Sequence, residues 1–117
     1  MTGRKVENMK KSEQEKINNL CVCVWDECMQ EASEYGLKYK GKLRTCTAQI
    51  LETPNFYVLQ SYNTLIACID KRENVLIDIL RYVYGYTATS AKHIAKFRQD
   101  YGRGMWGCVK EYRYYSL

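Results

Sequence analysis

The first third of the chain carries hydrophobic residues at helical spacing. They recur every three or four positions and so share one helix face: Ile17, Leu20, Cys21, Val24, Trp25, Cys28, Met29 and Ala32. Ser12 and Glu15 match a capping box, which satisfies backbone donors at a helix start. Gly36 is a typical helix stop. The pattern predicts a long amphipathic helix over 12–36, preceded by a frayed polar tail over 1–11.

From residue 37 the pattern changes to short runs of β-forming residues between polar turns. The runs over 43–50, 56–62, 65–70 and 75–80 are predicted strands, with a short helix as the alternative for the last of them. Proline, asparagine and charged residues mark the turns at 52–55, 63–64 and 71–74. Because turns this short join antiparallel neighbours, they predict a three- to four-stranded antiparallel meander.

The last third predicts a second, shorter helix. Thr89 or Ser90 can cap its start, and Gly102 ends it. The segment before it looks extended, and the aromatic and basic tail after it predicts an edge strand at about 105–114. We therefore expect one α+β domain over 1–117, with a sheet-plus-helix unit over 43–117. Two amphipathic helices covering one apolar sheet face predict a two-layer arrangement.

Composition places the chain among folded, soluble proteins. It has 117 residues, of which 46% are hydrophobic and 26% charged. Its most apolar helical stretch, over 20–25, is far too short to cross a bilayer, and no secretion signal is evident. We expect a cytoplasmic protein with no membrane partner.

The six cysteines are expected to be reduced and to pack as small hydrophobic side chains. A zinc site is disfavoured, because structural sites use paired ligands two to four residues apart on a turn. Cys21 and Cys23 lie on a predicted helix and point about 200° apart. We predict no metal and no other cofactor.

Catalytic signatures are weak. His93 is the only histidine, so imidazole-dependent chemistry built on it and a cysteine is the one enzymatic alternative. We interpret it instead as a surface or interface histidine near Phe97. The chain lacks a glycine-rich phosphate loop, a serine elbow and a paired-carboxylate signature. We expect a protein that acts by binding, with no catalytic residues.

The final third supplies a candidate contact surface. The formal charge is +5, and residues 71–117 hold nine basic and four acidic side chains. Basic groups neutralise phosphates and aromatic rings stack on bases, but the same residue types also anchor protein interfaces or pack a sheet–helix seam. The predicted binding residues are Arg81, Tyr84, Tyr86, Lys92, Lys96, Arg98, Arg103 and Trp106.

Two segments carry a family resemblance. The stretch over 57–64 and the run over 78–97, with its pattern YGYTATSA-x-HI-x-KF, resemble a small domain of unknown function from phages, prophages and mobile elements of Gram-positive bacteria. The resemblance implies a phage-type accessory protein in the cytosol of a bacterial host. The first helix lies outside it and is a candidate for homodimerisation or partner binding.

The resemblance sets the functional expectation. The leading hypothesis is a CRISPR-inhibitor-like protein that binds a host protein or protein–nucleic-acid complex and modulates nucleic-acid handling or defence. The alternative is a regulator that binds DNA or RNA directly through residues 81–113.

Overall fold

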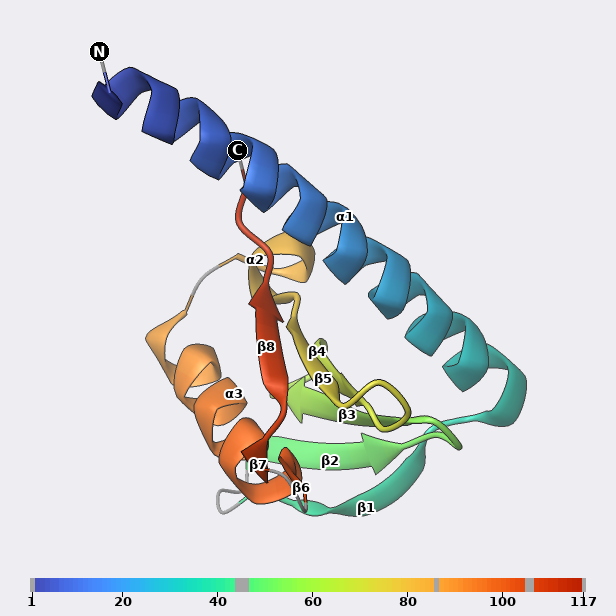
Figure 1. The fold of residues 1–117 in the computed structure, drawn as a ribbon. Helices are drawn as coiled ribbons and strands as arrows, with labels where there is room; N and C mark the ends of the chain where they lie inside the picture. The colour runs from blue at the N-terminus through green and yellow to red at the C-terminus, as the bar shows by residue number, and fades with distance from the viewer. Residues whose placement is uncertain (1, 44–46, 86, 105–106, 117) are drawn as a thin grey trace.

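The computed structural model describes residues 2–43, 47–85, 87–104 and 107–116. Figure 1 shows the elements in chain order: α1 (Thr2–Tyr35), β1 (Lys38–Lys42), β2 (Ala48–Glu52), β3 (Phe56–Ser61), β4 (Thr64–Asp70), β5 (Val75–Asp78), α2 (Leu80–Val83), α3 (Ala88–Tyr101), β6 (Arg103–Gly104), β7 (Gly107–Cys108) and β8 (Lys110–Arg113).

Six of the strands form one sheet in the order β1-β2-β3-β4-β5-β8. The first five are an antiparallel meander, and β8 runs parallel to β5, with Val75 opposite Lys110. A parallel neighbour requires a crossover, which α2 and α3 supply. The α+β class, the meander and the C-terminal edge strand are confirmed. The meander gains a strand because β1 and β2 are separate, so the sheet begins at Lys38.

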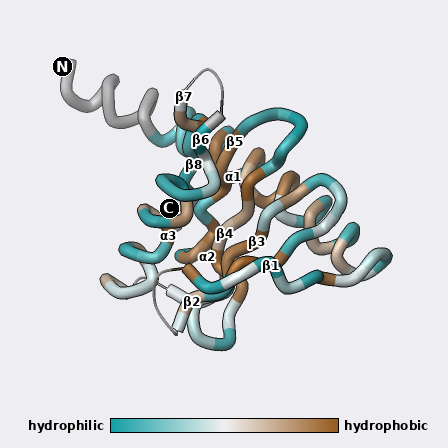
Figure 2. The backbone as a smooth tube through the Cα atoms, turned by 90° about the horizontal axis from the view of Figure 1, so that it is seen from below, coloured by the Kyte–Doolittle hydropathy of each residue, from teal (hydrophilic) through white to brown (hydrophobic). Residues whose placement is uncertain are grey.

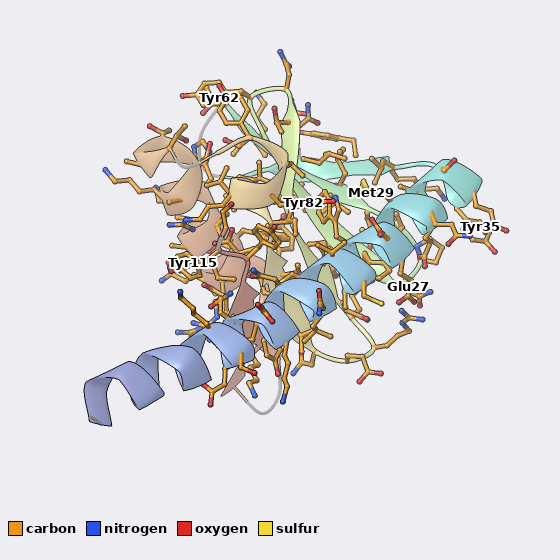
Figure 3. The ribbon with its side chains drawn as sticks, turned by 90° about the horizontal axis from the view of Figure 1, so that it is seen from above. Glu27, Met29, Tyr35, Tyr62, Tyr82 and Tyr115 are labelled. Carbon is orange, nitrogen blue, oxygen red and sulfur yellow. The ribbon has the colours of Figure 1, made fainter. Side chains whose placement is uncertain are left out.

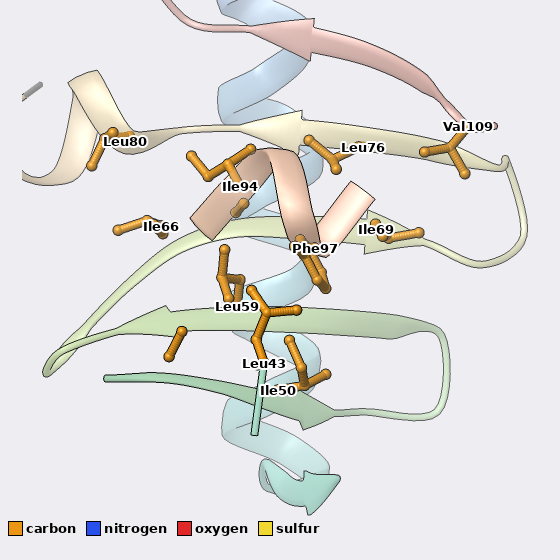
Figure 4. Packing of buried hydrophobic residues seen from close by; sticks show 12 residues of the cluster. Leu43, Ile50, Leu59, Ile66, Ile69, Leu76, Leu80, Ile94, Phe97 and Val109 are labelled. Atoms are coloured by element: carbon orange, nitrogen blue, oxygen red, sulfur yellow. The ribbon is translucent and has the colours of Figure 1, made fainter. Parts of the chain in front are cut away.

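The two helices lie on opposite faces of the sheet, so the two-layer expectation was wrong. In Figure 4, α3 crosses in front of the strands and α1 runs behind them. The reason is visible in β4, where all five residues from Ile66 to Asp70 are buried. A strand covered on both sides has a nearly continuous apolar sequence. One helix cannot bury both faces, so the chain places one on each.

Each face has its own core, and Figure 2 shows hydrophobic residues concentrated along the central strands. Under α1, Cys21, Trp25 and Cys28 pack on Phe56 and Ile77. Under α3, the centre is the fully buried Phe97 ring (Figure 4). The larger members around it are Leu43, Ile50, Leu59, Ile66, Ile69, Leu76, Leu80, Ile94 and Val109.

The first helix is longer than predicted. It begins at Thr2, so Ser12 lies inside it and caps nothing, and the frayed tail expected over 1–11 is helical backbone from Thr2 onward. Residues 4–11 are mostly straight-chain helix formers, which explains the extension. This end of α1 projects beyond the sheet (Figure 1). None of the helices in the described ranges combines the length and apolarity that a membrane span requires.

Two local features before and at the start of α3 also differ from expectation. Leu80–Val83 forms the short helix α2, where an extended segment was expected. Asp78 Oδ1 accepts the Leu80 N–H at 3.2 Å, which supports that turn. The cap of α3 is Thr87 rather than Thr89 or Ser90, and its hydroxyl accepts the Ser90 N–H at 3.2 Å.

Gly102 is required where α3 ends against β8. A Cβ there would lie 2.5 Å from the Arg98 carbonyl oxygen and 2.8 Å from Val109 Cγ2. We expect Gly102→Ala to destabilise the fold by about 1–3 kcal/mol, through overpacking. The midpoint of urea unfolding measures this. Gly41→Ala is the matched control, because its Cβ would meet nothing closer than 3.9 Å. Equal midpoints for the two variants would contradict the steric explanation.

Candidate functional site

A pocket of about 410 Å³ opens at the N-terminal end of α3. Three separate segments form its walls: the β3–β4 turn with the start of β4, the end of α2, and the first turn of α3. We call it the tyrosine pocket. It is lined by Ser61, Tyr62, Asn63, Thr64, Ile66, Tyr84, Thr87, Thr89 and Ser90. None of these nine residues carries a carboxylate, and two are tyrosines with exposed side chains.

Tyr62 holds an unusual backbone conformation at the rim of this pocket. Its φ is 55°, a left-handed value that costs a bulky residue about 1–3 kcal/mol. The turn is held by an earlier part of the chain, because the Tyr62 N–H donates to the Thr47 carbonyl at 2.7 Å. The side chain is nevertheless 56% exposed. An exposed aromatic residue therefore occupies a position where glycine or asparagine would be easier.

His93 ties two walls of the pocket together. Its Nδ1 lies 2.8 Å from Ser61 Oγ, which in turn lies 3.0 Å from Ser90 Oγ. His93 is only 4% exposed, so the surface alternative in its interpretation as a surface or interface histidine was wrong. The sequence does not reveal this, because the partner, Ser61, is distant in the chain. The network joins the end of β3 to the first turns of α3. Two of its members, Ser61 and Ser90, line the pocket, so these bonds help to fix its shape.

The electrostatics of His93 favour a positioning role over a catalytic one. Burial, and then the nearby Lys96 ammonium, lower the pKa of the imidazole. A serine–histidine pair used in catalysis needs the opposite, since the imidazolium that forms must be stabilised, usually by a carboxylate. The other ring nitrogen, Nε2, lies 3.5 Å from the Thr47 hydroxyl. The ring is thus a neutral hydrogen-bonding group at neutral pH.

The sheet separates the charges of the two helices. Along α1 from residue 13 onward, one lysine, Lys16, accompanies six carboxylates: Glu13, Glu15, Asp26, Glu27, Glu31 and Glu34. Within α3, Lys92, Lys96 and Arg98 accompany Asp100. Because the helices lie on opposite faces, the α1 carboxylates do not neutralise the lysines of α3. The part of α1 from residue 13 onward is therefore acidic, and α3 carries a net positive charge.

One of the predicted binding residues lines the tyrosine pocket, and two follow the pocket residues along α3. Tyr84 lines it and is 67% exposed. Lys92 is exposed on α3, and Lys96 lies one turn further along. Both follow the pocket residue Thr89 at helical spacing on one side of α3. Within the described ranges, neither lysine forms an ion pair.

The other predicted residues are placed elsewhere. Arg98 donates to the Val109 carbonyl at 2.8 and 3.1 Å, which ties α3 to the chain entering β8. Arg81 stacks on the Tyr115 ring at 4.6 Å, beside the opposite flank of α3. Arg103 is exposed in β6. Tyr86 and Trp106 lie outside the described residues. Among the predicted residues that the structure describes, Tyr84, Lys92 and Arg103 are exposed. Arg81 and Arg98 instead contact other parts of the fold.

The β3–β4 turn is a site component that the sequence did not predict. Asn63 and Thr64 were expected to be only a polar break, and Tyr62 the end of a strand. A tyrosine directly before Asn-Thr was the available signal. Its significance depends on α3 folding over the same turn, which no local pattern shows.

The cysteines are divided between the interior and the surface. Cys21, Cys28 and Cys68 are buried under α1, and burial raises the pKa of Cys21 to about 12. Cys23 and Cys108 are exposed, so the expectation of packing was wrong for them. Cys46 lies outside the described residues. In the part of the chain that is described, no group of three or more acidic, histidine or cysteine side chains could hold a metal ion.

Substituting His93 tests the network. Burial lowers the pKa of His93, so protonation favours the unfolded chain. In the unfolded chain the histidine has a pKa of about 6.5. The stability from neutral His93 is complete above that pH and is lost as pH falls below it. We expect His93→Asn, which can retain a bond to Ser61, to be less stable than wild type at neutral pH. The difference in unfolding free energy should shrink as pH falls below about 6.5.

Urea unfolding of both proteins across this pH range measures the difference. Carboxylates titrate in both, so subtraction isolates His93, the only histidine. A difference that stays constant with pH would show that the folded state does not disfavour the imidazolium.

Comparison with known proteins identifies a family. A model of a family of unknown function, DUF8033, matches residues 26–112. The match runs from within α1 into β8 and includes the tyrosine pocket and all of α3. Neither a curated protein nor a solved structure matches the chain. Because the family model covers most of its length, the chain belongs to the DUF8033 family of unknown function.

Proposed function

We propose that this protein is a non-catalytic binding protein whose target is single-stranded nucleic acid, free or held within a nucleic-acid-handling complex. The observation that carries the proposal is the combination of two exposed tyrosines, at a pocket lined by no carboxylate, with two lysines further along the helix that forms one wall of the pocket. These lysines, Lys92 and Lys96, follow the pocket residue Thr89 on the same side of α3. Single-strand binders combine a basic surface along the backbone with aromatic faces for the bases.

The charge layering supports an anionic target on the α3 side. The two lysines lie one turn apart on α3, about 6 Å along the helix axis. Successive phosphates of an extended strand can reach two ammonium groups at this spacing. The carboxylates of α1 from residue 13 onward repel the same strand, which favours its approach from the α3 side.

A protein partner is the second candidate, favoured by the exposed aromatic side chains of α2. Tyr82 and Val83 are exposed beside Tyr84, and the Tyr82 ring packs edge-on against Tyr114 at 5.1 Å. Tyrosines and arginines are common interface anchors. This surface suits the phage-type inhibitor expected from the sequence, acting by occupying a host defence complex.

Binding to a fluorescent single-stranded oligonucleotide, followed by anisotropy at increasing salt, tests the nucleic-acid proposal. We expect Lys92→Gln/Lys96→Gln to weaken binding at low salt. It should also reduce the slope of log K against log salt by about 0.7 for each phosphate that the variant no longer neutralises.

The matched control is Lys11→Gln/Lys16→Gln, which removes the same charge from α1. It should leave both affinity and slope close to wild type. Absence of binding to any single strand at low salt would reject nucleic acid as the target. Recovery of a host protein by this chain from a nuclease-treated lysate would then support a protein partner.

A further inference from the structure

We propose that the tyrosine pocket captures one unstacked base of a single strand, with Tyr62 and Tyr84 supplying the stacking faces. The inference rests on the proposed function and adds to it a site that recognises bases rather than phosphates. The pocket volume, about 410 Å³, lies in the range of ligand sites, about 300–1,000 Å³. That is ample room for a base together with its sugar.

The rings at the rim are available for stacking. Tyr62 projects from the β3–β4 turn, and Tyr84 caps the end of α2. The centre of the Tyr62 ring lies 6.2 Å from the centre of the His93 ring, and Tyr62 is 56% exposed, so the Tyr62 ring is accessible to a ligand. Tyr35, the last residue of α1, is another exposed tyrosine, and Figure 3 shows it on a different side of the molecule from Tyr62. Two exposed tyrosines from separate segments thus line the same pocket.

The polar groups of the pocket suit the edge of a base. Asn63, Thr64 and Thr89 form no side-chain hydrogen bond within the part of the chain that the structure describes. An amide and two hydroxyls can both donate and accept, which matches the mixed donors and acceptors of a base edge. A carboxylate would repel the neighbouring phosphates, and none of the nine lining residues supplies one.

Hydrogen bonds between separate segments of the chain hold the pocket in shape. Ser61 and Ser90 line it and are held by each other and by His93, while the Thr47 carbonyl holds the Tyr62 backbone. A tyrosine at this positive φ gives the fold no conformational advantage, because asparagine adopts the same φ more easily. An exposed tyrosine at a strained position is consistent with a role for its ring in binding.

The test compares a short oligonucleotide with the same oligonucleotide carrying abasic sites at its centre, in DNA and RNA forms, by anisotropy. We expect wild type to bind the abasic strand about 5- to 150-fold more weakly. Tyr84→Ala and Tyr62→Asn should bind the intact strand at the level of the abasic one and show no preference between them.

Two features keep the test decisive. Tyr62→Asn relieves the strained backbone, so it should fold at least as stably as wild type and lose affinity all the same. Tyr35→Ala, at a ring that is 62% exposed at the far end of α1, should behave as wild type. If wild type binds intact and abasic strands equally while the Lys92 and Lys96 effect persists, the pocket proposal is overturned and the proposed function stands. If neither strand binds, both fail.

Discussion

The central strands of the sheet are buried on both faces, and this burial fixes where the two long helices pack. Apolar side chains of β3, β4 and β5 point both ways, so the sheet is stable only between two layers. The helix α1 covers one face through Cys21, Trp25 and Cys28, and α3 covers the other through Ile94 and Phe97. Each helix owes its place to this requirement.

The same constraint arranges the charges. Because one helix is needed on each face, the acidic outer side of α1 and the lysines of α3 end up on opposite sides of the domain. Lys92 and Lys96, which form no ion pair with any described residue, are then available on α3. Had both helices covered one face, as expected from the sequence, their charges would have lain together and largely cancelled.

The crossover from β5 to β8 creates the candidate site. It carries α3 over the β3–β4 turn, so the first turn of the helix meets Ser61 and Tyr62 from an earlier part of the chain. His93 fastens this junction as a neutral side chain. The crossover also engages Arg98 with Val109 at the other end of α3. Within α3, His93 and Arg98 therefore hold the fold, whereas Lys92 and Lys96 form no ion pair with a described residue.

Elements with local signals could be predicted from the sequence alone. Helical spacing over residues 17–32, short β-forming runs and the glycine at 102 predicted the first helix, the meander and the end of α3. Of the predicted binding residues, Tyr84 lines the pocket, and Lys92 and Lys96 lie further along the helix whose first turn forms one of its walls. These features depend on periodicity and residue type, which act over a few positions.

The layers, the pocket and the use of each charged side chain depend instead on three-dimensional packing. Whether a helix covers one face or the other depends on contacts between residues distant in sequence, which no local period encodes. The same holds for Ser61 and His93, which are 32 positions apart, and for Arg98, which bonds to a backbone carbonyl beyond the helix. A basic residue and an exposed ring look alike in sequence whether they bind a partner or hold the fold, because packing alone distinguishes them.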